Sequence, residues 1–300
     1  SSLIFSRYCF SICLAMAQGT NSISLSVRIG ICAPSTPFSR EAADRVLALA
    51  ARTHPQAELI FDEQCFLVEG HFAGNDEQRT DSFVALANDA SIDAIWFARG
   101  GYGAARIAEA AIAQLGDGSK KKIYLGYSDA GNLLGALYRE AIGEVAHGPM
   151  PSDIARQGGE RAVCRALDWI VHRQKDVLEP GLTAGKKYAA FNLMTLAMMT
   201  GTKLMPNLRD HIVLIEEISE YLYAFDRAMF HLSGNLEAHG LAGIKLGRIG
   251  NIPENDRPFG ESAEDITRRW CDRANIPYLG QADIGHDADN KIVPFGLLNI

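Results

Sequence analysis

The sequence predicts an α/β protein, with an open parallel sheet in its first part and a smaller α/β domain in its second. From residue 27 onward, short apolar runs alternate with segments of helical periodicity, which is typical of right-handed β-α-β units. Between about residues 151 and 188, glycines and a proline interrupt this alternation. The chain has 300 residues, of which 47% are hydrophobic, so it is long enough for two domains with buried cores.

The first domain is expected to span residues 27–150. Ser39 is the expected N-cap of its first helix, whose inward face would carry Ala43, Val46, Leu47 and Ala50. The expected strands are 27–33, 59–61, 92–98 and 123–127, and the expected later helices are 76–88, 104–115 and 130–140.

A connector is expected over residues 151–175, with a helix that opens at Gly158-Gly159 and runs to His172. The second domain is expected to span residues 176–300, and residues 1–26 would form an N-terminal extension. In the second domain the expected helices are 192–199, 225–236 and 264–274, and the expected strands are 212–216 and 244–249.

Composition excludes some classes of partner. The 36 acidic and 29 basic residues give a formal charge of −7, so no nucleic-acid partner is expected. The six cysteines include no C-x-x-C pair. Because disulfide frameworks belong to small secreted domains, we expect free thiols in a reducing compartment.

The first residues allow two interpretations. Residues 3–17 carry one arginine and an apolar run ending at Ala15-Met16-Ala17, which loosely resembles a short signal peptide. The run is too short for a membrane span of about 20 residues, so no membrane partner is expected. In the second interpretation, which we favour, Met16 is the true start and residues 1–15 are upstream sequence, because the first convincing strand begins only at Val27.

The expected strand 123–127 runs into Ser128 and then into a helix. This is the arrangement of a nucleophile elbow, in which a serine hydroxyl stands exposed beside the amide groups of a helix N-terminus. The spacing is not G-x-S-x-G, since residue 130 is alanine. From the pattern alone, Ser128 or Asp129 could equally well cap the helix.

The strand before it runs into Gly100, Gly101 and Gly103, which let the backbone approach a ligand closely. A dinucleotide fingerprint fails here, because Arg106 stands where the third glycine belongs. Residues 287–290 resemble a calcium loop only faintly, and Lys291 takes the next ligand position. The sequence therefore predicts neither a metal nor another cofactor.

A serine nucleophile needs a histidine to take its proton and a carboxylate to orient that histidine. His286 follows a glycine in a loop, and Glu216 ends an expected strand. His147, which ends another candidate strand, is a rival for the histidine role. The residues alone leave open that Glu216 is a member of an ion pair and His286 a surface residue.

Four groups of residues, in this order along the chain, resemble the motifs of a known family. They are Ala73-Gly74-Asn75-Asp76-Glu77-Gln78-Arg79 with Arg99-Gly100-Gly101-Tyr102-Gly103-Ala104-Ala105-Arg106; Gly126-Tyr127-Ser128-Asp129 with His147-Gly148-Pro149-Met150; Leu214-Ile215-Glu216-Glu217 with Tyr223-Ala224-Phe225-Asp226-Arg227; and Gly285-His286 with Pro294-Phe295-Gly296. Over about residues 27–296 they resemble the motifs of the LD-carboxypeptidase family. These are serine peptidases of peptidoglycan recycling, related to the microcin C immunity proteins.

The resemblance implies a catalytic triad of Ser128, Glu216 and His286, in the cleft between an N-terminal α/β domain and a smaller C-terminal domain. It also implies an oxyanion hole made of the backbone N–H groups of Gly101 and Asp129, where a Cβ at residue 101 would obstruct the substrate carbonyl. No cofactor is implied. The implied protein is a cytoplasmic homodimer that hydrolyses an L,D peptide bond of muropeptides and releases terminal D-alanine from a tetrapeptide.

Two other functions stay open: a microcin-immunity-like serine amidase that cleaves a peptidyl-nucleotide toxin, and an inactive family member that only binds. Three departures from the family pattern bear on substrate shape and stability. Ala190-Phe191 stand where glycine usually precedes Asn192-Leu193, Ala130-Gly131 stand where a β-branched residue is common, and the sequence ends at Ile300, soon after Gly296.

Overall fold

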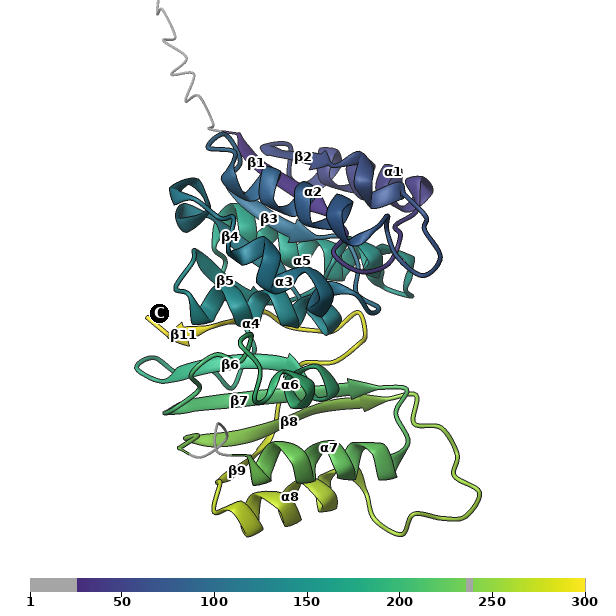
Figure 1. Ribbon diagram of the computed structural model, residues 1–300, viewed down its shortest axis with the longest axis vertical. Coiled ribbons are helices and arrows are strands. Elements are labelled where there is room, and N and C mark those ends of the chain that lie inside the picture. The colour runs from purple at the N-terminus through teal and green to yellow at the C-terminus, as the bar shows by residue number, and fades with distance from the viewer. Residues whose placement is uncertain (1–25, 236–239, 300) are drawn as a thin grey trace, which may run out of the picture.

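The computed structural model describes residues 26–235 and 240–299 and contains two sheets, one in each half of the molecule (Figure 1). The first sheet has the strand order β10-β5-β4-β3-β1-β2, and only β10 is antiparallel to its neighbour. Its strands are β1 (Val27–Cys32), β2 (Ala57–Phe61), β3 (Ala94–Phe97), β4 (Ile123–Gly126), β5 (Glu144–His147) and β10 (Val293–Pro294).

Helices cover both faces of the first sheet. The helices α2, α3 and α4 contact one another in series, while α1 and α5 pack together on the other side (Figure 1). These helices are α1 (Arg40–Thr53), α2 (Asp76–Asn88), α3 (Ala104–Ile112), α4 (Gly131–Arg139) and α5 (Gly159–His172). Short 3-10 segments lie between them: η1 (Glu63–Phe66), η2 (Asp117–Lys121), η3 (Ser128–Ala130) and η4 (Pro151–Ala155).

The second sheet has the order β11-β6-β7-β8-β9, in which β6 to β9 are parallel and β11 is antiparallel to β6. Its strands are β6 (Lys187–Asn192), β7 (His211–Ile218), β8 (Gly243–Gly250), β9 (Tyr278–Gln281) and β11 (Gly296–Leu297). Its helices are α6 (Leu193–Met199), α7 (Leu222–Gly234) and α8 (Ala263–Ala274), and α7 packs against α8 (Figure 1).

The predicted fold class is therefore confirmed, and one predicted inward residue is wrong. Ser39 caps α1 by accepting a hydrogen bond from the Ala42 N–H. Leu47 is 40% exposed, whereas Leu49 is buried. The buried face of α1 is centred on Val46 and turned toward Leu49, which leaves Leu47 at its edge.

The strands at 187–192, 278–281 and 293–297 were not predicted. The two-residue strands β10 and β11 exist because they pair with β5 and β6, and pairing between distant segments leaves little local pattern. The segment that contains both strands returns between the two halves, coloured yellow in Figure 1.

The domain boundaries 27–150, 151–175 and 176–300 stay predictions. Within 151–175, the helix α5 packs on α1 and η4, and its Val163 and Leu167 lie in the same buried cluster as Ile29 of β1. The first sheet also takes in β10, which lies far along the chain.

Some predictions fall on residues that the structure does not describe. The two interpretations of the first 17 residues, Cys9, Cys13 and the end of the expected helix 225–236 lie outside the described residues. Within the described ranges, Cys32, Cys65, Cys164 and Cys271 are free. No helix in those ranges combines the length and the apolar character needed to cross a membrane.

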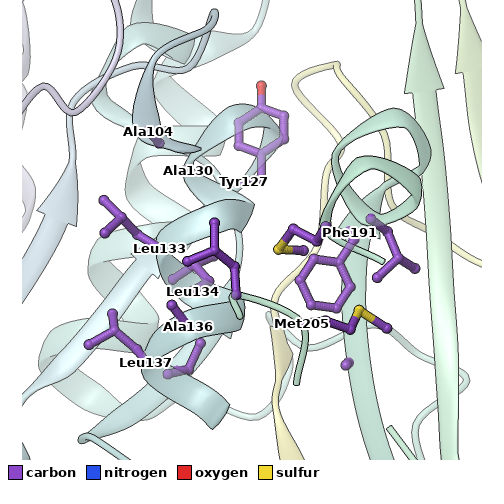
Figure 2. Packing of buried hydrophobic residues seen from close by; sticks show 14 of the residues in the cluster. Ala104, Tyr127, Ala130, Leu133, Leu134, Ala136, Leu137, Phe191 and Met205 are labelled. Atoms are coloured by element: carbon purple, nitrogen blue, oxygen red, sulfur yellow. The ribbon is translucent and has the colours of Figure 1, made fainter. Parts of the chain in front are cut away.

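One buried cluster joins the two halves. Figure 2 shows Leu133, Leu134 and Leu137 of α4 on one side and Phe191 and Met205 of the second half on the other. Phe191 is 1% exposed, and its ring packs against that of Phe295 with centroids 5.0 Å apart. Phe191, one of the two residues that stand where the family usually has glycine, thus fills the core between the halves.

We expect Phe191→Ala to lower the free energy of unfolding by about 3–5 kcal/mol, because a buried ring is replaced by a cavity. Chemical denaturation followed by circular dichroism measures the loss. Phe230→Ala is the matched control, since Phe230 is 57% exposed and its loss should cost far less. Equal costs for the two variants would contradict the central role of this cluster.

Candidate active site

Ser128 lies at a sharp turn between β4 and α4, in the first residue of η3. Its φ of 60° places it in the left-handed region, which a non-glycine residue enters only at a cost. Its side chain is partly exposed, while the neighbouring Tyr127 and Asp129 are buried. This strained, exposed position at the end of a parallel strand is the geometry of a nucleophile elbow.

The carboxylate of Asp129 joins this turn to the glycine loop. It accepts hydrogen bonds from the Ser35 hydroxyl (2.6 Å), the Ala104 N–H at the start of α3 (2.8 Å) and the Asn132 amide (3.1 Å). Burial raises the pKa of Asp129, and these hydrogen bonds oppose the rise. The Thr36 hydroxyl donates to the Gly100 carbonyl at 2.7 Å, so the loop is held from both sides.

His286 and Glu216 form a hydrogen-bonded pair through His286 Nδ1 and Glu216 Oε2. Glu216 lies in β7 and is completely buried, and the His286 side chain is 9% exposed. Burial alone would lower the pKa of His286, but the charge of Glu216 and its hydrogen bond outweigh burial and raise the pKa above its ordinary value. The rival His147 is fully buried and bonds to Asn290 instead.

Glu217, the next residue of β7, is also buried and points into the pocket. It accepts hydrogen bonds from the Asn192 amide (2.6 Å), the Met194 N–H (2.8 Å) and the Ile218 N–H (2.9 Å). Burial raises the pKa of Glu217 to about 7, against the effect of these bonds. Glu217 thereby fixes the start of α6 against β7.

A pocket of about 270 Å³ brings the predicted residues together. Ser128, His286, Gly101 and Asp129 all line it, and Glu216 lies behind His286. Side chains from both halves complete the wall: Tyr102, Ala105, Asn132, Asn192, Met194, Thr195, Met198, Glu217, Ile218 and Glu220.

The structure gives two reasons of its own for a glycine at residue 101, and the expected obstruction of the substrate carbonyl stays a prediction. A Cβ on Gly101 would lie 2.5 Å from Thr36 Cγ2, so it would clash with the protein itself. Gly101 also has a φ of +111°, which L residues rarely adopt. Gly100 makes room for the Ser128 side chain, since a Cβ on Gly100 would lie 2.9 Å from Ser128 Oγ.

The residues of the faint calcium-loop pattern, 287–290, make contacts within the protein. Asp287 accepts hydrogen bonds from the Arg248 guanidinium, and Asp289 is largely exposed. Across residues 26–235 and 240–299, no group of three or more His, Cys, Asp or Glu side chains is arranged to hold a metal ion.

The sequence alone assigned no site role to Asn192 or Thr36, and it did not separate Gly100 from the other glycines of its loop. Asn192 was visible only as the expected start of a helix, and Thr36 gave no signal, because its contact with Gly100 joins residues far apart in the chain. Glu217 stood beside Glu216 in the acidic motif, but nothing in the pattern separated their roles.

Two family models match the chain. Residues 29–148 match the N-terminal domain of LD-carboxypeptidase, and residues 188–298 match its C-terminal domain. The chain belongs to the LD-carboxypeptidase family. As predicted from the sequence, it is a serine peptidase.

Curated members of the LD-carboxypeptidase family agree over most of the chain. A putative carboxypeptidase of Synechocystis sp. is 28% identical over 291 residues, covering 90% of this chain and 89% of the relative. The murein tetrapeptide carboxypeptidase of Pseudomonas aeruginosa is 26% identical over 249 residues, covering 75% and 78%.

Solved structures share the fold. A muramoyltetrapeptide carboxypeptidase from Oxalobacter formigenes superposes with a TM-score of 0.76 at 23% identity, covering 90% of this chain and 93% of that one. MccF in complex with glutamyl sulfamoyl guanosine superposes with a TM-score of 0.74 at 18% identity, covering 91% and 92%. At these identities the likeness establishes the fold.

We expect Gly101→Ala to lower both stability and activity. The clash with Thr36 and the positive φ should cost roughly 1 kcal/mol or more. If the Gly101 N–H holds the oxyanion, kcat should also fall about 10²–10³-fold in the folded fraction.

The control is Gly74→Ala, at a second glycine of positive φ that does not line the pocket. It should lose stability and keep its kcat. Melting temperature and kcat are measured together for both variants. An undiminished kcat in folded Gly101→Ala would show that the N–H of residue 101 does not form part of the oxyanion hole.

The raised pKa of His286 predicts a pH profile. His286 can accept a proton only when neutral, so kcat/KM should fall with decreasing pH, with a midpoint above the ordinary histidine value of 6.5. Glu216→Gln removes the charge that raises this pKa and leaves burial, which lowers it. The midpoint should therefore move to lower pH, together with a lower maximal rate.

Glu220→Gln removes a charge from the same pocket and should leave the midpoint in place. The rate of reaction with a fluorophosphonate, followed from pH 5 to 9, provides the profile. An unshifted midpoint in Glu216→Gln would show that Glu216 does not set the pKa of His286.

Proposed function

We propose that this protein is a serine carboxypeptidase that hydrolyses the L,D peptide bond of a murein tetrapeptide and releases its terminal D-alanine. The observation that carries the proposal is the hydrogen-bonded pair of His286 and Glu216 in the same pocket as Ser128, which is held at a strained turn. The Pseudomonas aeruginosa relative is a murein tetrapeptide carboxypeptidase and the Oxalobacter formigenes relative a muramoyltetrapeptide carboxypeptidase, which supports the choice of substrate.

The triad acts in two steps, acylation of the serine and hydrolysis of the acyl-enzyme. Ser128 Oγ attacks the carbonyl carbon of the L residue while His286 Nε2 takes the hydroxyl proton, and the Nδ1–H of His286 donates to Glu216. The backbone N–H groups of Gly101 and Asp129 receive the oxyanion. The proton on His286 then passes to the amine of the leaving D-alanine, and water, activated by His286, hydrolyses the acyl-enzyme.

Several parts of the environment support this assignment. Asp129 and Thr36 fix the glycine loop beside Ser128. The Thr195 hydroxyl of α6 reaches the Ser128 carbonyl at 3.5 Å, which links the nucleophile to the second half. We propose in addition that the enzyme is cytoplasmic, acts in peptidoglycan recycling and forms a homodimer, as the family resemblance implies.

A second candidate is a serine amidase that cleaves a peptidyl-nucleotide. The observation that favours it is the superposition on MccF bound to glutamyl sulfamoyl guanosine. Purified protein is therefore offered a murein tetrapeptide and, separately, an acyl-sulfamoyl adenylate. Release of D-alanine from the first, with much slower cleavage of the second, supports the carboxypeptidase; the reverse preference overturns it.

Ser128→Ala should lower kcat by about 10⁶-fold, because the nucleophile and its histidine act as a unit. A fluorophosphonate should modify Ser128 in the wild type, detected by mass spectrometry of the labelled peptide, and should not modify the variant. Circular dichroism checks that the variant is folded. Near-normal turnover by folded Ser128→Ala would falsify the triad, and absence of labelling in the wild type would indicate a binding protein without catalysis.

A further inference from the structure

The segment of residues 73–79 belongs to the first group of family motifs, but the triad gives it no role. The structure describes this segment completely, and none of its residues lines the pocket. It ends at Arg79 in α2, whose side chain is 0% exposed. Because taking a guanidinium out of water is costly, a fully buried arginine requires an explanation.

One guanidinium nitrogen of Arg79 joins two separate pieces of backbone. Nη1 donates to the Pro34 carbonyl at 2.6 Å and to the Gly103 carbonyl at 2.9 Å. Pro34 lies just after β1, and Gly103 is the N-cap of α3 at the end of the glycine loop. Nη2 donates to Asp76, three residues earlier in α2. A charged donor makes stronger hydrogen bonds than a neutral one, so Arg79 is a firm link between the two pieces.

Gly103 has the conformation and the space that this contact requires. Its φ is +146°, and a Cβ on it would lie 2.7 Å from Arg79 Nη1 and 3.0 Å from Phe72 Cδ1. The Phe72 ring lies against the guanidinium, with 4.7 Å between its centroid and Arg79 Cζ. A residue without a Cβ therefore lets the guanidinium reach the backbone here.

The glycine loop is thus held at both ends. At one end the Thr36 hydroxyl donates to the Gly100 carbonyl, and at the other Arg79 donates to the Gly103 carbonyl. Gly101 lies between these two anchors and lines the pocket. Since a loop rich in glycine has many accessible conformations, it keeps a single one only where its surroundings fix it.

Stability alone does not explain a charge at this place. Arg79 Nε is buried and has no hydrogen-bond partner among residues 26–235 and 240–299. Replacing a buried charged side chain together with its partner by apolar groups of similar volume is often neutral or stabilising. What an apolar side chain could not do is hold the Pro34 and Gly103 carbonyls at fixed positions.

We propose that Arg79 is a positioning residue for the oxyanion hole, which fixes the glycine loop so that the Gly101 N–H faces the reacting carbonyl. This inference rests on the proposed function. Arg79 does not line the pocket, so it acts through the loop. Its loss should leave substrate binding largely intact and weaken the stabilisation of the transition state.

The test compares two arginines that share their neighbours. Arg106 also bonds to Asp76, at 3.0 Å through Nε, and its Cζ lies 4.8 Å from the centroid of the Phe72 ring. Its side chain is 46% exposed and bonds to neither of the carbonyls that Arg79 holds. Arg79→Met removes the hydrogen bonds and keeps much of the side-chain volume, and Arg106→Met is the matched control. In Arg79→Met, Asp76 keeps Arg106 as its partner.

With a murein tetrapeptide, Arg79→Met should lower kcat about 100-fold per folded molecule, because a displaced loop misdirects the Gly101 N–H. KM should change little, and Arg106→Met should keep the wild-type kcat. The pH midpoint of fluorophosphonate labelling should stay in place, since Arg79 does not contact His286 or Glu216.

A second measurement needs neither substrate nor catalysis. Amide hydrogen exchange in a peptide covering residues 100–106 of the native protein, followed by mass spectrometry, should become about tenfold faster in Arg79→Met, as expected for the loss of a hydrogen bond that holds the loop. The rate should not change in Arg106→Met. If Arg79→Met does not fold, Arg79→Lys takes its place, because a lysine side chain ends about one bond short of Nη1 and cannot hold both carbonyls.

An unchanged kcat in the folded Arg79 variant would overturn the proposal, and so would an unchanged exchange rate. Equal losses in Arg106→Met would also overturn it, since the effect would then come from the contacts with Asp76 and Phe72. A shifted pH midpoint would place the effect at His286 instead. If the wild type neither releases D-alanine nor reacts with the fluorophosphonate, the proposed function fails, while the exchange rates still decide whether Arg79 holds the loop.

Discussion

The left-handed backbone of Ser128 is the constraint on which the arrangement of the site depends. A non-glycine residue at a φ of 60° costs roughly 1–2 kcal/mol, and the turn keeps this conformation only because its surroundings hold it. Asp129 ties the turn to Ser35 and Ala104, and Gly100 leaves room for the serine side chain. The strain exposes the hydroxyl that a relaxed helix start would direct elsewhere.

The site is shared between two halves that one core holds together. The first half supplies the turn at Ser128 and the glycine loop, and the second supplies Glu216 from β7 and His286 from the loop after β9. Because Phe191 and Met205 pack against the leucines of α4, the halves keep a fixed distance (Figure 2). Packing next to the pocket therefore sets how Ser128 and His286 face each other.

Features that depend on nearby residues could be predicted from the sequence, and features that depend on distant contacts could not. The cap at Ser39 and the turn at Ser128 follow from short patterns. The exposure of Leu47 depends on how α1 rests on its sheet, and β10 exists only through β5. The clash of a Gly101 Cβ with Thr36 could not be predicted for the same reason, because Thr36 lies far from residue 101 in the chain.

The strand β10 has a consequence for the order in which the enzyme becomes complete during synthesis. Residues 27–148 contain Ser128, the proposed nucleophile, but the sheet edge at β5 stays unpaired until residues 293 and 294 have been made, and His286 comes only shortly before them. A nascent chain that has folded only its first half therefore has Ser128 without His286 beside it. In the proposed mechanism, hydrolysis can begin only once the segment after β9 has packed between the halves.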